Sequence, residues 1–421
     1  MGQVVKLEPK AKKGADSTSG RRRRRSKTAL VLGGGGFTGG VYEIGALRAL
    51  DLLTVNRTVN DFDVYVGTSA GAFVAALTAN GATPEEMMRV VNRQKPSPFS
   101  DVDLGTLLRP NLTGFAKSAA QMPFRALGVM RSLASQLGQV SAMDLVLGLA
   151  EGLPSGAYTG EGIERYVRAV LDEENRSDDF RMVERELYIT ATDLDTCERI
   201  VFGVEGWDDV PISTAVRAST ALPMVYTPVH VRDRELVDGG IVSTTNLDIA
   251  VSAGAKFIVV VNPLVPYVND FKTKVRTLTG TRTRHVSDMG FPQIGYQAFK
   301  MVAYQRLHEM ARQWEQRYPG VDIVLIEPEP DDELMFQTSI MNFTSRVEVA
   351  RHGFQSVTTQ LAFRYPHFRE VCQRHGIEIS PRRVRKVMKH FEAEQGRTRA
   401  WRKILEQTTG ALLRQSAASK D

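Results

Sequence analysis

Cysteine is scarce in this chain, which has 421 residues but only Cys197 and Cys372. Two isolated cysteines exclude a disulfide framework and a cysteine-rich metal site, and they favour a reducing compartment. The metal-binding pattern H-E-x-x-H and the acidic calcium loop are also missing from the sequence. We therefore expect a protein without a bound metal or other cofactor.

Long apolar runs are missing as well. A helix that crosses a bilayer needs about 20 apolar residues, and no stretch of the sequence approaches that length. Residues 29–32 follow several basic residues but form an apolar run of only four, too short for a secretory signal. The sequence predicts neither a signal peptide nor a transmembrane segment, and hence a cytoplasmic protein.

Positive charge is concentrated near the two ends. The formal net charge is +6, but residues 1–27 alone contribute +8, so the remainder sums to −2. This segment includes the run from Arg21 to Arg25 and is predicted to be a disordered basic tail. Residues 381–403 hold nine Lys or Arg against two Glu, which predicts a basic helix. Both segments could contact an anionic membrane peripherally. The alternative is a solvated tail and a solvated helix, and no nucleic-acid partner is expected.

The alternation of apolar segments predicts the domain organisation. A strand at 28–32, a glycine loop and a helix at 41–53 are followed by a strand at 62–66 and a helix at 72–80. This order is typical of an α/β fold with parallel strands. We expect the main domain to span residues 28–345. Within it, residues 84–153 form a helical insertion, either a possible lid or substrate channel or a subdomain with its own small core. Residues 346–421 form a basic helical C-terminal extension.

Further along, the pattern predicts helices at 162–171 and 212–219 and buried strands at 256–261 and 321–326. It also predicts two hairpins, one of 186–191 with 199–204 and one of 229–231 with 235–237.

A G-x-S-x-G sequence separates the second strand from its helix. Gly67 and Gly71 flank Ser69 at two residues on either side, and small residues there allow the backbone to turn tightly. A strand, this turn and a helix are the context of a nucleophile elbow, which holds a serine hydroxyl clear of the sheet. Ser69 is therefore the candidate nucleophile.

The glycine run after the first strand has two interpretations. Backbone N–H groups of Gly34, Gly35 and Gly36 could turn into one concavity beside a helix N-terminus and stabilise an oxyanion. Gly34, Gly36 and Gly39 also fit the dinucleotide pattern G-x-G-x-x-G. That pattern requires an acidic residue after the second strand, where this chain has the elbow, so the oxyanion interpretation is favoured.

The base for the serine is less evident. None of the seven histidines has a local sequence suited to catalysis, and His230 alternates with apolar neighbours as a structural residue does. Asp238 ends a predicted strand and precedes Gly239 and Gly240. A free Asp, with a pKa near 3.9, is a poor base, but partial burial raises that value. The alternative for these three residues is a simple turn.

Four blocks, in this order along the chain, resemble the patatin-like phospholipase family. They are GGGGFTGG at 33–40, GTSAG at 67–71, ASTALP at 218–223 and DGG at 238–240. The resemblance covers about residues 28–263. It implies a three-layer α/β/α fold with a mostly parallel central sheet, and a lipid acyl hydrolase with Ser69 as nucleophile and Asp238 as general base. It also implies an oxyanion hole in the loop of Gly34, Gly35 and Gly36, no catalytic histidine and no cofactor.

One residue departs from the family pattern. Thr38 stands where the family's glycine loop usually has arginine, which leaves headgroup preference open. The implied substrates are phospholipids, lysophospholipids or acylglycerols. Two other functions remain open at this point: a transacylase that uses the same two residues, and a non-catalytic lipid-binding protein.

Overall fold

The structure is a computed structural model. It describes residues 26–94, 99, 104–135, 151–269, 271, 275–276, 282–283, 285–330, 332, 334–335 and 344–389. The basic tail up to residue 25, part of the predicted helical insertion and residues 390–421 of the predicted C-terminal extension lie outside the described residues.

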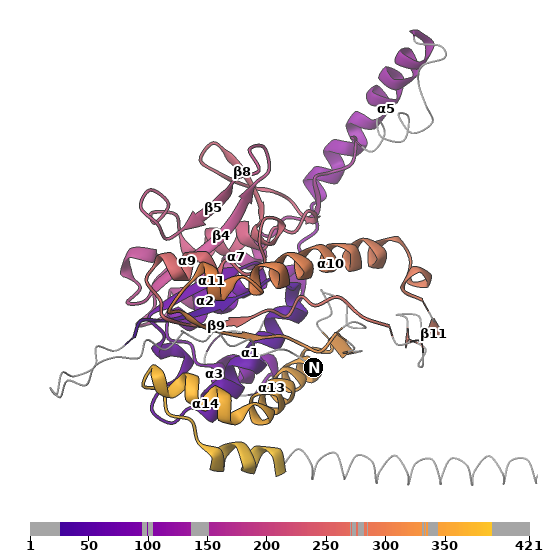
Figure 1. The fold of residues 1–421 in the computed structure, drawn as a ribbon. Coiled ribbons are helices and arrows are strands. Elements are labelled where there is room, and N and C mark those ends of the chain that lie inside the picture. The colour runs from indigo at the N-terminus through magenta and orange to yellow at the C-terminus, as the bar shows by residue number, and fades with distance from the viewer. Residues whose placement is uncertain are drawn as a thin grey trace, which may run out of the picture.

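A mostly parallel sheet forms the centre of the molecule (Figure 1). Its strand order is β12-β9-β1-β2-β4-β8-β7, with β5 also paired to β4. The first five strands of that order run parallel, whereas β5, β8 and β7 add antiparallel pairs at one end. The strands are β1 Thr28–Leu32, β2 Val64–Thr68, β4 Glu186–Asp193, β5 Arg199–Phe202, β7 Val229–Val231, β8 Arg234–Asp238, β9 Phe257–Val261 and β12 Asp322–Ile326.

Alternate side chains of the strands face two separate cores. Leu30 and Leu32 of β1 belong to the larger core, whereas Ala29 and Val31 belong to the smaller one on the opposite face. Helices cover both faces, which gives the predicted three layers. The larger core includes helices α1 Gly36–Leu53, α2 Ala70–Ala79, α3 Pro84–Val91, α7 Glu161–Leu171, α8 Ile212–Ser219, α13 Arg346–Phe363 and α14 Tyr365–Arg374. The smaller core includes α9 Leu247–Ser252, α10 Phe291–Ala311 and α11 Trp314–Arg317.

Shorter elements complete the described chain. Strands β3 Gly156–Tyr158 and β6 Met224–Tyr226 form a parallel pair, and β10 Val275–Arg276 and β11 Arg282–Thr283 form an antiparallel pair. The 3₁₀ helices are η1 Val59–Asp61, η2 Phe180–Met182, η3 Gly239–Ile241 and η4 Val286–Met289.

The glycine loop is shorter than the sequence indicates, because α1 begins at Gly36 rather than near residue 41. Helix propensity disfavours glycine, but two glycines of this helix have close neighbours. A Cβ on Gly39 would lie 3.1 Å from the Pro263 side chain, and one on Gly40 would lie 3.3 Å from Ala70. Tertiary packing therefore explains the glycines that the sequence pattern assigns to a loop.

The C-terminal helices pack on the main domain. Helix α13 lies against α1 so closely that a Cβ on Gly45 would be 2.2 Å from the Ala350 carbonyl oxygen. A Cβ on Gly353 would be 2.5 Å from the Tyr42 carbonyl oxygen. Glycines at both positions thus permit a close backbone approach, and α13 supports the helix that carries the glycine loop.

Within the insertion, α4 Leu104–Leu107 and α5 Leu112–Ser135 follow α3. Figure 1 shows α5 as a long helix that projects away from the rest of the fold. Among the helices of the described residues, none combines the length and the hydropathy that crossing a membrane requires.

Candidate active site

Ser69 occupies the turn between β2 and α2 with a strained backbone, φ 55° and ψ −126°. The flanking glycines make that turn possible. A Cβ on Gly71 would lie 2.4 Å from the Leu32 carbonyl oxygen, and one on Gly67 would lie 2.5 Å from Ala72 Cα. A non-glycine residue held at positive φ is typical of a functional turn. The predicted elbow is thus present as a backbone geometry.

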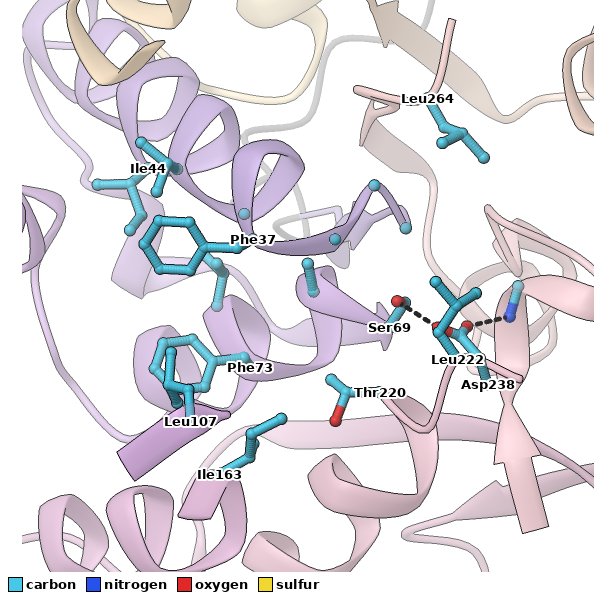
Figure 2. Close-up of a pocket in the computed structure, with 18 of the residues that line it drawn as sticks. Phe37, Ile44, Ser69, Phe73, Leu107, Ile163, Thr220, Leu222, Asp238 and Leu264 are labelled. Carbon is cyan, nitrogen blue, oxygen red and sulfur yellow. Dashed lines mark hydrogen bonds between the residues drawn. The ribbon is translucent and has the colours of Figure 1, made fainter. Parts of the chain in front are cut away.

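Asp238 lies directly beside this serine, although 169 residues separate the two in sequence. Ser69 Oγ donates a hydrogen bond to Asp238 Oδ2 at 2.6 Å, and the Gly240 amide donates to Asp238 Oδ1 at 2.8 Å (Figure 2). Strand register explains the meeting: Thr68 pairs with Thr190 on β4, and the next β4 residue, Ala191, pairs with Asp238. The antiparallel β8 therefore ends beside the turn that follows β2.

Burial changes the acidity of this carboxyl group. Asp238 is 4% exposed, and desolvation raises its pKa to about 6, against smaller opposing contributions from its hydrogen bonds with Ser69 and Gly240. At neutral pH the group is ionised, yet it holds a proton more tightly than the carboxylate of a free Asp does. This change makes it better matched to accept a proton near pH 7.

The glycine loop closes over the other side of the serine. Gly34, Gly35 and Gly36 line the same cavity as Ser69, and a Cβ on Gly34 would lie 3.3 Å from Ser69 Cβ. Gly36 has a φ of 62° and begins α1. The N-termini of α1 and α2 thus both lie beside Ser69, and a helix N-terminus carries partial positive charge.

Residues to which the sequence analysis assigned no role of their own hold the turn in place. Ser219 Oγ accepts a hydrogen bond from the Ser69 amide at 2.8 Å. Asn246 Nδ2 donates to Thr68 Oγ1 at 2.9 Å and to Thr190 Oγ1 at 3.0 Å. The sequence gives only a weak signal for these groups, since isolated small polar residues occur throughout the chain.

Glu43 of α1 is a second buried acid near the loop. It is 0% exposed, and burial raises its pKa well above the usual range, opposed in part by the Gly33 backbone. The Gly33 amide itself donates to the Val261 carbonyl at 2.9 Å. Thr38, at the position where the family resemblance leads one to expect arginine, is 4% exposed in the first turn of α1.

An apolar cavity of about 150 Å³ extends from Ser69 into the larger core. Asp238 and Arg346 are the charged residues among the described ones that line it. Arg346 Nε donates to the Val91 carbonyl at 2.9 Å, and Phe73 stacks on Tyr166 with ring centroids 5.8 Å apart. Figure 2 shows Phe37, Ile44, Phe73, Leu107 and Ile163 on the side of the cavity away from Asp238.

Imidazole groups lie elsewhere. No described histidine lines the cavity. Four of them instead face carboxylates outside it, in the pairs His230 with Glu235, His308 with Glu327, His352 with Asp332 and His375 with Asp322. Across the described part of the chain, no group of three His, Cys, Asp or Glu side chains is placed to hold a metal ion.

The fold and this site define a class: an α/β protein with a serine on a strained strand-to-helix turn, a carboxylate beside it and a glycine loop above an apolar cavity. Comparison with known proteins gives the family. The family model described as patatin-like phospholipase matches residues 30–251, about half of the chain. The chain therefore belongs to the patatin-like phospholipase family, as its four sequence blocks predicted.

Individual relatives are distant. The chain is 21% identical over 222 residues to a protein of Invertebrate iridescent virus 6 described as probable lipid hydrolase 463L, a match that spans 53% of this chain and 62% of that protein. Among solved structures it is similar to VipD from Legionella pneumophila, with 14% identity, a TM-score of 0.34, and coverage of 80% of this chain and 66% of VipD. It is also similar to human GIVD cytosolic phospholipase A2, with 11% identity, a TM-score of 0.32, and coverage of 80% and 58%. Each of these matches spans less than two thirds of the other protein's own length.

Proposed function

We propose that this chain is a serine acyl hydrolase that cleaves carboxylic ester bonds of lipids, as phospholipases A and lysophospholipases do. The observation that carries the proposal is the 2.6 Å hydrogen bond from Ser69 Oγ to the buried carboxylate of Asp238 at the end of an apolar cavity. A nucleophile within hydrogen-bond reach of a base is the arrangement that covalent acyl transfer requires.

In the proposed reaction, Ser69 Oγ bonds to the ester carbonyl carbon while Asp238 takes the serine proton. Negative charge then develops on the carbonyl oxygen, beside the N–H groups of the Gly34, Gly35 and Gly36 loop. When the ester C–O bond breaks, the leaving alkoxide takes the proton from Asp238, and an acyl-serine remains. A water molecule next gives its proton to Asp238 and attacks the acyl carbon. The bond between that carbon and Ser69 Oγ then breaks, Ser69 Oγ takes the proton back from Asp238, and the carboxylic acid is released.

The cavity indicates which part of the substrate enters. Its walls are dominated by aliphatic and aromatic side chains, so it suits an acyl chain and disfavours a charged headgroup. The headgroup side of the ester would then lie outside the apolar part of the cavity. Substrates are therefore proposed to be acyl esters of glycerol or of glycerophosphate.

Lipid digestion with matched variants tests this proposal. Wild type, Ser69→Ala and Asp238→Asn are incubated with phosphatidylcholine, lysophosphatidylcholine and diacylglycerol, and released fatty acid is measured. We expect release by wild type alone. The His230→Ala variant is the control, since His230 is exposed and lies outside the cavity. Undiminished release by Ser69→Ala would refute the proposal.

The same experiment separates a hydrolase from a transacylase. Both reactions use an acyl-serine, and they differ in whether water or an alcohol opens it. Added glycerol should leave the yield of free fatty acid unchanged if water is the acceptor. New acylglycerol formed at the expense of fatty acid would assign the transacylase function instead.

Peripheral membrane contact through the two basic ends is a separate proposal. Residues 1–25 and 390–421 lie outside the described residues, whereas residues 381–389 are helical and hold five of the nine cations counted at 381–403. The proposal rests on the charge of the two segments.

A further inference from the structure

Helix α5 carries four exposed large apolar side chains. Phe124 is 77% exposed and Leu112 is 71% exposed, although apolar residues of a globular protein normally gather in its core. Phe115 and Leu127 are about half exposed. Figure 1 shows the reason, because α5 extends away from the body of the protein. At about 1.5 Å per residue its 24 residues reach roughly 36 Å.

The charge of α5 is of one sign. Between Leu112 and Ser135 the sequence has Lys117, Arg125 and Arg131 and no acidic residue. Arg125 donates to the Glu151 carbonyl at 2.8 Å. Within the described residues, no carboxylate forms an ion pair with Lys117 or Arg131.

Helical spacing places cations and apolar side chains together. Phe124 is seven residues from both Lys117 and Arg131, which is about two helical turns, so the three residues lie along one side. Leu127 follows Phe124 by three residues and is its neighbour on the helix surface. This side of α5 therefore combines apolar side chains with positive charges at either end of the apolar pair.

The base of α5 is fixed next to the cavity. Leu107 of α4 lines the cavity, and Asn111, just before α5, is 6% exposed. Asn111 donates from its side chain to the Gly156 carbonyl at 3.0 Å and accepts from the Gly114 amide at 3.0 Å. A binding event along α5 would thus occur on an element anchored at the cavity wall.

We propose that α5 is an interfacial arm that binds the surface of an anionic lipid bilayer. Phe124 and Leu127 enter the boundary between headgroups and acyl chains, and Lys117 and Arg131 bind the anionic headgroups. A projecting helix with exposed apolar residues, whose charged side chains are all cations, is typical of peripheral membrane elements. This inference deepens the proposed function, because the arm would hold the cavity at the surface where its substrate lies.

Vesicle flotation tests the arm. The full chain with Ser69→Ala, which prevents digestion of the vesicles, is mixed with phosphatidylcholine vesicles or with phosphatidylcholine–phosphatidylglycerol vesicles. We expect stronger binding to the anionic vesicles. Adding Phe124→Ser with Leu127→Ser should weaken that binding at least tenfold, since each side chain loses its transfer from water. Adding Lys117→Glu with Arg131→Glu should weaken it about fivefold or more per cation.

Two control substitutions match these variants. Phe363, at the end of α13, is also 77% exposed, so Phe363→Ser removes an equally exposed ring from the body and should leave binding unchanged. Lys256, exposed at the amino end of β9, is the matching charge control as Lys256→Glu.

The outcomes separate this inference from the proposed hydrolase. Equal flotation of the Phe124→Ser, Leu127→Ser protein and its parent would overturn the arm, as would equal binding to the two kinds of vesicle. With Ser69 intact, the arm variants should cleave a short water-soluble ester at the wild-type rate. If wild type cleaves no ester while flotation still depends on α5, the hydrolase fails and the arm stands.

Discussion

Apolar side chains have opposite surroundings in the cavity beside Ser69 and on helix α5. The side chains that line the cavity are packed into the core, and Leu77 among them is only 1% exposed. Leu127 on α5, in contrast, is 49% exposed. The same residue type therefore stabilises the fold in one region and is available to a partner in the other. Residue type alone does not distinguish these roles. What distinguishes them is whether the helix that carries the residue packs on the core or projects from it.

The largest expected effect concerns the carboxylate of Asp238, which lies in the packed region beside the cavity. Replacing Asp238 by Asn keeps the shape and leaves partners for Ser69 and Gly240, but it removes the proposed base. General-base contributions are typically about 10²–10⁴-fold, so kcat on a soluble ester should fall by about that factor. Steady-state kinetics measures it, and an unchanged kcat would show that Asp238 is not the base.

The same variant should gain stability at alkaline pH. Burial raises the pKa of Asp238 to about 6, so the stability that its neutral form provides is fully present below the unfolded pKa near 4 and is lost as pH rises through about 6. Asn avoids that loss, a gain of up to about 3 kcal/mol at pH 8. Urea unfolding at pH 8 and at pH 4 checks the sign, because the gain should vanish at pH 4.

A matched pair of leucines compares the two regions directly. Leu77→Ala opens space in the packed core and should cost about 2–5 kcal/mol of unfolding free energy. Leu127→Ala removes the same atoms from an exposed helix and should change stability by less than about 0.5 kcal/mol. Chemical denaturation of both variants measures the difference. Similar losses would mean that α5 is packed and would also remove the basis for the interfacial arm.

Activity should depend on pH through the same carboxyl group. Asp238 accepts a proton only when ionised, and its pKa lies at about 6. Hydrolysis of a neutral soluble ester should therefore fall about tenfold per pH unit below that value and level off above pH 7. Circular dichroism at each pH controls for unfolding. A flat profile between pH 5 and 8 would contradict the assignment.

The sequence predicts most of the site but little of its support. Ser69, Asp238 and the loop glycines occur in short motifs whose local backbone requirements are visible in the residue types. The hydrogen bonds of Asn246 to Thr68 and Thr190 depend on strands far apart in sequence, so no local pattern reveals them. The early start of α1 at Gly36 was also missed, because the close approach of Pro263 to Gly39 is a tertiary contact. The projection of α5 follows from the path of the chain, which periodicity does not determine.

The smallest expected effect on activity concerns Glu43, the other buried acid of the packed region. Burial raises its pKa well above the usual range, so the carboxyl group is neutral in the fold and costs stability as pH rises and the unfolded chain ionises. Glu43→Gln imitates the neutral acid and should leave ester hydrolysis unchanged, while wild type should lose stability relative to this variant as pH rises from about 4, the unfolded pKa of Glu, to pH 7. Thermal unfolding at the two pH values measures this. An equal fall in both proteins would mean that Glu43 is already ionised, and lost activity with normal stability would mean that its proton helps to hold the glycine loop.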